Sequence, residues 1–204
     1  NESGDDKYWV AGFSALSEPR RSGPAPPDQP PGPDMTVSLY DASVPVYRRS
    51  RRNLSVILDK AVAWAGEHKV DPAVLLSSRL YPDMFPLVRQ VQSATDQAKG
   101  AIHRLTGVEN PKFPDTETTI DELKARISRL IEFLESVPRE KFDGAETREV
   151  EVRIAGEMRK MSGLHYLMHV GLAHFFFHVT TAYDILRHNG VPLGKADYIG
   201  RGAL

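Results

Sequence analysis

The sequence predicts an all-α protein, an antiparallel four-helix bundle with a small β-hairpin before its last helix. Apolar residues recur at spacings of three and four along four long segments, and helix start and stop signals bound each of them. One stretch between the third and fourth segments instead alternates apolar and charged residues with a period of two. With 204 residues and 41% hydrophobic content, the chain is long enough to bury one core.

The first predicted helix follows Asp41, has Pro45 near its start and carries one apolar stripe, formed by Leu54, Ile57, Leu58, Ala61 and Ala65. A short helix and a break follow in "VDPAVLLSSRLYPDMFP". The second long helix is expected to open with Asp83 and Pro86 in its first turn and to end at Gly107. Its apolar face consists of Leu87, Val91, Ala94, Ala98, Ala101, Ile102 and Leu105.

The third and fourth helices flank the hairpin. Thr119 and Glu122 have the spacing of a capping box, and Pro138 stops the third helix. The segment "REVEVRIAGEMRKM" predicts a small hairpin with its turn at Gly156. Ser162 is a suitable N-cap for a fourth helix that runs to about residue 189, with Gly190 as its terminator. The following "NGVPLGKADYIG" is expected to fold back and seal one end of the bundle.

The N-terminal segment differs in kind from the rest of the chain. Residues 1–34 hold seven of the 15 prolines and almost no periodic apolar pattern, which disfavours a packed core. The sequence therefore predicts a disordered, Pro-rich extension over residues 1–34 and one folded domain over residues 35–204.

Charge and composition exclude several classes of function. Lys and Arg (26) nearly balance Asp and Glu (27), so no overall field favours nucleic acid or an anionic membrane, and neither is expected as a partner. The basic run "RRSRR" at residues 48–52 wraps around the first helix, which is typical of a solvated helix surface. The chain has no cysteine, so a metal would need His, carboxylate, amide or water ligands. No apolar run approaches the ~20 residues of a membrane-spanning helix, and we expect a soluble, cytoplasmic protein.

Two histidine pairs lie on the predicted fourth helix. His174 and His178 are four residues apart, share one face and would present two imidazole nitrogens to a single ion. The same spacing also suits core histidines that donate to a carbonyl or hydroxyl group, and the sequence leaves both interpretations open. His165 and His169 lie about half a turn away, near the helix start, where surface or hairpin-facing positions are expected.

Three motifs point to a known family. The segments "FFFHVTTAYDILRHNGVPLGKADYIG", "RLYPDMFPLVRQV" and "AKGAIHRLTG" together resemble the domain of unknown function 1993 family, over about residues 35–203. That family is similar to a branch of the DinB/YfiT superfamily of four-helix bundles. The resemblance implies a DinB-like bundle and a homodimer, and an apolar load on the fourth helix beyond one stripe favours the homodimer too. Many DinB-like proteins hold a divalent metal between a His on the second helix and an HxxxH pair on the fourth, and some catalyse thiol-dependent transfer or isomerisation.

Carried onto this chain, the resemblance places His174 and His178 on the HxxxH pair and Gln90 where the second helix would supply its His. It implies one divalent ion (Zn, Ni, Mn or Fe) held by His174 and His178, with Gln90 or Asp96 and water completing the shell, and an enzyme acting on a small molecule in the bundle cavity. Further polar residues expected around that cavity are Thr181, Asp96 and Tyr183. The alternative is a metal-free bundle without catalysis that binds a small ligand or a partner helix, with a polar network of His174, His178, Gln90 and Thr181.

Overall fold

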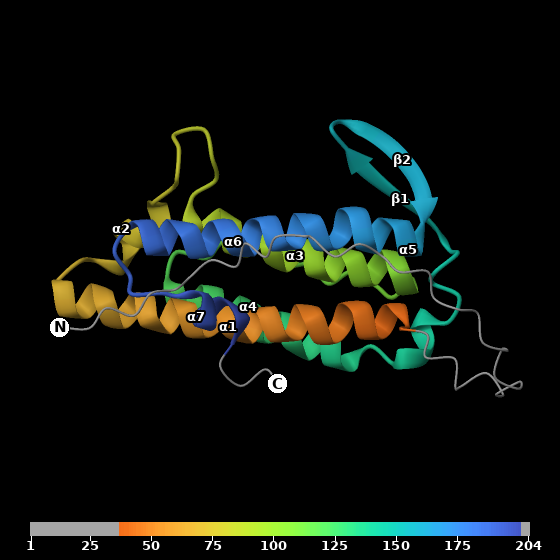
Figure 1. Ribbon diagram of the computed structural model, residues 1–204, viewed down its shortest axis with the longest axis horizontal. Coiled ribbons are helices and arrows are strands. Elements are labelled where there is room, and N and C mark those ends of the chain that lie inside the picture. Colours follow the sequence, from red (N-terminus) through yellow and green to blue (C-terminus); the bar gives the residue numbers. More distant parts are fainter. Residues whose placement is uncertain (1–36, 201–204) are drawn as a thin grey trace, which may run out of the picture. The chain divides into compact units, whose positions relative to one another are not determined.

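The structure is a computed structural model that describes residues 37–200, so the predicted Pro-rich extension lies outside the described residues. Long helical segments lie alongside one another, namely α1 (Leu39–His68), α3 (Leu87–Thr106), α4 (Ile120–Ser136) and α6 (Leu172–His188), as Figure 1 shows. Shorter elements are α2 (Pro72–Ser77), α5 (Gly163–Tyr166), α7 (Lys195–Ile199), the 3-10 helix η1 (Arg139–Phe142), the π-helix η2 (Leu167–Gly171) and strands β1 (Glu149–Ile154) and β2 (Glu157–Ser162). The described chain is thus mostly helical, with one small hairpin.

Capping chemistry sets where the helices begin. The predicted capping box is confirmed, because the backbone N–H of Glu122 donates to Thr119 Oγ1 (3.2 Å) and Glu122 Oε2 accepts from the Thr119 N–H (3.0 Å). The start predicted for α1 is wrong. Ser38 caps the helix by accepting from the Asp41 N–H, so the first turn is complete before Pro45, which lies inside the helix.

The hairpin is confirmed where the period-two pattern placed it. Strands β1 and β2 pair antiparallel, and Ala155 (φ 49°) and Gly156 (φ 87°) form the connection. Two consecutive positive φ angles fit the right-handed twist of the strands. Val150 and Val152 are buried while Glu149 and Glu151 are exposed, which accounts for the alternation.

The last helical segment begins and ends as predicted but is not uniform. Ser162 caps α5 by accepting from the His165 N–H, and Gly190 (φ 97°) follows the last turn of α6. Between α5 and α6, the wide π-turn of η2 changes the angular register of every residue after it. The most deeply buried positions at the start of α6 are therefore Phe175 and Val179, while His174 and His178 are only half-buried.

The long helices contact one another to different extents, and the line along which α1 faces α6 is called the seam. Helix α6 lies along α3 for much of its length, and α4 contacts both α1 and α3, whereas α1 and α6 touch more sparsely. The C-terminal segment that was expected to fold back onto the bundle includes a helix, α7, which packs on α1. Its Tyr198 hydroxyl pairs with Thr180 Oγ1 of α6 (2.8 Å), and the Tyr198 carbonyl accepts from Asn53 of α1 (2.9 Å). Helix α7 thereby links α1 to α6.

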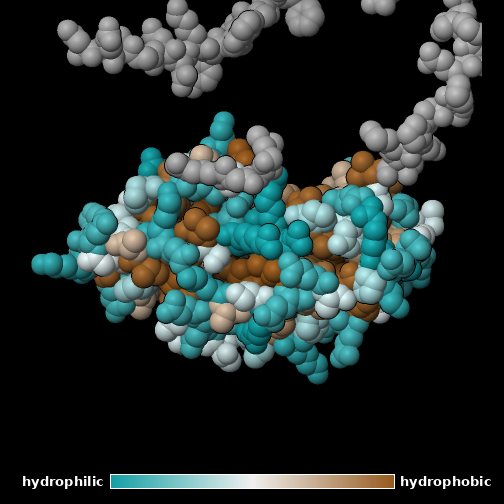
Figure 2. All heavy atoms as spheres, turned by 90° about the horizontal axis from the view of Figure 1, so that it is seen from below, coloured by the Kyte–Doolittle hydropathy of each residue, from teal (hydrophilic) through white to brown (hydrophobic). Residues whose placement is uncertain are grey.

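The surface of this domain is mixed in character. On the face drawn in Figure 2, hydrophobic residues form patches among hydrophilic ones. No helix within residues 37–200 combines the length and apolarity needed to cross a bilayer.

A polar layer between α1, α3 and α6

The candidate site begins with a contact between two residues that the sequence analysis paired. The imidazole Nδ1 of His178 on α6 lies 2.8 Å from Gln90 Oε1 on α3. The amide nitrogen of Gln90 donates to the Phe85 carbonyl (3.1 Å), which leaves the amide oxygen to accept from His178. Nδ1 of His178 therefore carries the proton, and Nε2 holds the lone pair.

His178 is held in its neutral form. Burial lowers its pKa to about 4, and the nearby charges of His174 and Arg51 act in the same direction. A neutral, oriented imidazole presents Nε2 as a hydrogen-bond acceptor or a metal ligand.

The other predicted site residues have separate roles. Thr181 Oγ1 donates to the Phe177 carbonyl (2.7 Å), Tyr183 packs edge-on against Tyr198 (5.8 Å between ring centroids), and Asp96 pairs with Arg126 (2.8 Å). His174 is half-buried and acts on His178 through its charge. Within residues 37–200, His178 lies within hydrogen-bonding distance of Gln90, whereas Thr181, Asp96 and Tyr183 interact with other partners.

Across the seam, α1 supplies two buried polar side chains that the sequence analysis missed. Tyr47 and Arg51 are both 0% exposed and lie one turn apart on the same face of α1. Both rest on Phe175 of α6, Tyr47 edge-on with ring centroids 4.8 Å apart and Arg51 with its guanidinium carbon 5.0 Å from the ring centroid. Among residues 37–200, neither the Tyr47 hydroxyl nor any of the three Arg51 guanidinium nitrogens has a hydrogen-bond partner.

Burial shifts both groups in the directions expected. The pKa of Arg51 falls to about 9, mainly because its charge is desolvated and partly because Arg126 is near. Desolvation likewise raises the pKa of the Tyr47 hydroxyl. At neutral pH the seam therefore contains a cationic Arg51 and a neutral Tyr47.

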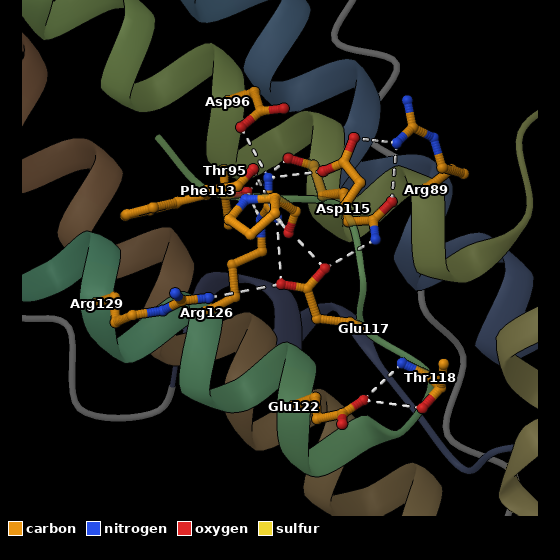
Figure 3. Close-up of polar contacts among 12 residues, drawn as sticks. Arg89, Thr95, Asp96, Phe113, Asp115, Glu117, Thr118, Glu122, Arg126 and Arg129 are labelled. Atoms are coloured by element: carbon orange, nitrogen blue, oxygen red, sulfur yellow. Dashed lines mark hydrogen bonds and ion pairs between the residues drawn. The ribbon is translucent and has the colours of Figure 1, made fainter. Parts of the chain in front are cut away.

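A second buried arginine lies in a fully formed polar cluster, drawn in Figure 3. Arg126 of α4 is 0% exposed, and every guanidinium nitrogen has a partner. Nε donates to Thr95 Oγ1 (2.6 Å), and the terminal nitrogens bind Asp96 (2.8 Å), Asp115 (3.0 Å), Glu117 (3.2 Å) and the Pro114 carbonyl (3.0 Å). The cluster ties the loop before α4 to α3, and its completeness indicates a structural role.

Arg51 corrects the expectation that the "RRSRR" run is wholly solvated. Arg51 stands in register with Tyr47, Leu54 and Leu58, all buried on the inner face of α1. Arg126 likewise falls beside Leu123 and Ile127 on α4. A charged residue in the apolar stripe of an amphipathic helix is the signal that would have identified both.

Comparison with known proteins supports the family suggested by the motifs. Residues 39–199 match the family described as domain of unknown function (DUF1993). The chain belongs to this family. A solved structure of a DinB family member protein from Shewanella denitrificans is 43% identical in sequence to this chain. The matched region covers 79% of this chain and 92% of the Shewanella chain, with a TM-score of 0.75. No curated protein matches the sequence.

The DinB likeness raises the question of whether this family member's residues suit a divalent ion. Across residues 37–200 there is no group of three or more His, Cys, Asp or Glu side chains placed to hold a metal. The amide oxygen of Gln90 is engaged by His178 rather than directed toward an ion, and the nearby Arg51 contributes a positive charge. Two imidazoles, an occupied amide and a neighbouring cation are a poor donor set for a dication.

Proposed function

We propose that this chain is a metal-free, DinB-like antiparallel four-helix bundle that binds a small molecule at the polar layer between α1, α3 and α6, without catalysis. The observation that carries the proposal is the hydrogen bond between His178 and Gln90, two of the three residues that would otherwise be metal ligands. Their donor and acceptor groups are directed at each other, which suits an oriented binding surface better than a coordination sphere.

The chemistry of the layer supports ligand binding. His178 contributes a neutral acceptor at Nε2, and its orientation is set by Gln90. Arg51 and Tyr47 contribute donors, and Phe175 contributes an aromatic surface between them. A few oriented polar groups on an apolar background are typical of small-molecule sites.

Elemental analysis tests the proposal. Untagged protein is incubated with excess Zn, Ni, Mn or Fe(II) at neutral pH, freed of unbound ion by gel filtration and measured for metal per chain. We expect far less than one ion per chain, and no difference between the wild type and His178→Ala, because neither presents a complete donor set. His169→Ala is the matched control, since His169 is an exposed histidine on the same helical segment.

One result would support the metal-dependent enzyme instead. Near-stoichiometric metal that is lost in His178→Ala and His174→Ala but kept in His169→Ala would show that the HxxxH pair binds an ion, and would overturn the metal-free proposal.

A further inference from the structure

The two buried arginines form an internal comparison. Both are 0% exposed, yet Arg126 has partners at every guanidinium nitrogen, whereas Arg51 has none within the described part of the chain. The carboxylate that acts on Arg51 through space, Asp96, is bound to Arg126 and Lys99 instead. Within residues 37–200, the fold thus pairs one buried guanidinium with its own side chains and leaves the other without a directly bound carboxylate.

A buried guanidinium without partners is costly. Removing a charge from water costs several kcal/mol unless another charge or hydrogen bonds replace the lost hydration. Arg51 does not avoid this cost by losing its proton, because a pKa of about 9 leaves it charged at neutral pH. The missing partner is therefore an acceptor, and an anion compensates both the charge and the donors.

The surroundings of Arg51 contain further features of an anion site. The Tyr47 hydroxyl is also buried and unpaired within the described residues, and Tyr47 lies one helical turn from Arg51 with its ring against the same Phe175 ring. Gly171 of η2 lies beside it, and a Cβ atom there would stand 3.5 Å from the Tyr47 oxygen, in ordinary contact. The side chains that carry these four donor atoms thus both contact one aromatic ring, in the seam between α1 and α6.

We propose that Arg51, assisted by the Tyr47 hydroxyl, binds the carboxylate of a small organic monoanion in the seam between α1 and α6. The inference rests on the proposed function, because the carboxylate would be the charged part of the ligand bound at the polar layer. The planar guanidinium fork matches the two oxygens of a carboxylate. A monoanion balances the single charge of Arg51 and its apolar body suits the Phe175 surface, whereas a phosphate dianion would bring a second, unbalanced charge.

The test uses thermal unfolding and titration calorimetry with acetate, benzoate, inorganic phosphate and chloride at constant ionic strength. Four variants accompany the wild type: Arg51→Met, Arg51→Lys, Tyr47→Phe and, as the matched control, Arg49→Met at an exposed position of the same helix. Circular dichroism confirms that each variant is folded.

For the wild type and Arg49→Met we expect a saturable rise in melting temperature with acetate or benzoate, since a ligand that binds only the folded state stabilises it. Arg51→Met should lose the saturable response, and without anion should unfold at the same or a higher temperature, because it removes an uncompensated charge. Arg51→Lys should respond more weakly, because it keeps the charge but not the fork. Tyr47→Phe should bind about three- to tenfold more weakly, which corresponds to one hydrogen bond.

Three outcomes would overturn the inference: no saturable response to either carboxylate, equal responses in the wild type and Arg51→Met, or an Arg51-dependent response to phosphate or chloride alone. The metal analysis described above is independent of this test. A metal-free protein that ignores carboxylates would refute the anion site alone. A protein that binds metal through His178 and carboxylate through Arg51 would refute only the metal-free proposal.

Discussion

At the scale of single residues, some buried ionisable side chains are paired with groups of opposite charge or with hydrogen-bond partners, and others are not. Arg126 occupies a core position because carboxylates, carbonyls and a hydroxyl replace its hydration. His178 is tolerated by a different means, since burial holds its imidazole neutral and Gln90 satisfies its N–H group. The stability of the protein should therefore respond to mutation of Arg126 and, through His178, to pH.

The Arg126 cluster predicts a large asymmetry between neighbouring arginines. Arg126→Met should lower the free energy of unfolding by about 3 kcal/mol or more, because it leaves the nearly buried Glu117 without its main partner. Arg129→Met should change stability by less than about 1 kcal/mol, since Arg129 is exposed and lies 3.6 Å from the same carboxylate. Urea unfolding measures both, and similar losses in the two variants would contradict a structural role specific to Arg126.

His178 predicts a pH dependence of stability with a defined sign. Its pKa is lowered from 6.5 to about 4 in the fold, so between these values the unfolded chain binds a proton that the folded chain does not. The contribution is absent above about pH 6.5, and stability falls as the pH drops from there toward 4.

The pH prediction is checked by thermal unfolding at a series of pH values from 4 to 8. His178→Gln should show a shallower loss of stability in this window, and the exposed control His169→Gln should follow the wild type. Matching pH profiles for His178→Gln and the wild type would show that the imidazole is not held neutral.

At the scale of elements, two backbone features position the site residues. The π-turn of η2 sets which face of α6 is buried, and so places Phe175 against Tyr47 and Arg51 while His178 reaches Gln90. The junction from β2 into α5 determines where that helical segment begins. At this junction the Gly163 N–H donates to the Arg148 carbonyl (2.9 Å).

Gly163 predicts a strict requirement for glycine at the junction. A Cβ atom there would lie 2.0 Å from the Ala145 carbonyl oxygen, so Gly163→Ala must displace backbone and should cost about 2 kcal/mol or more. Gly66→Ala is the matched control, because Gly66 lies on the exposed face of α1 with nothing within 4 Å. It should stabilise the protein by about 0.5–1 kcal/mol, and chemical denaturation measures both variants. A neutral Gly163→Ala would mean that the junction adjusts easily.

At the scale of the whole molecule, apolar side chains are exposed along the last helical segment. Leu164, Met168 and Phe177 are 47%, 51% and 56% exposed, and Met158 of the hairpin is 55% exposed. Several exposed large apolar residues on one helical segment are compatible with a surface that another protein covers. The homodimer expected from the DinB resemblance would use such a surface.

We therefore predict a homodimer at micromolar concentration, measured by light scattering. Met168→Glu should shift the mass toward that of a monomer without loss of helix content, because it places a charge in an apolar interface. Val62→Glu, a comparable change at an exposed position of α1, should leave the dimer intact. A wild-type protein of monomeric mass would exclude the dimer.

Local chemistry made most of the elements predictable from the sequence. The Thr119–Glu122 box, the period-two strands, the Ser162 cap and the terminating Gly107 and Gly190 depend on residues a few positions apart, and the structure has all of them. The resemblance to DinB-like proteins, which aligns Gln90 and His178 with metal ligands of that superfamily, brought the two partners of the central hydrogen bond under consideration.

Contacts between distant segments were decided by the tertiary structure alone. Gln90 and His178 are 88 residues apart, and Arg126 meets Asp96 across 30 residues, so neither pairing follows from a helical period. The π-turn rotated α6 away from the face that a regular helix would bury, which placed Phe175 rather than His174 at the deepest position. Whether a buried arginine is neutralised depends on which carboxylates fold onto it, and for that reason the sequence by itself did not distinguish Arg51 from Arg126.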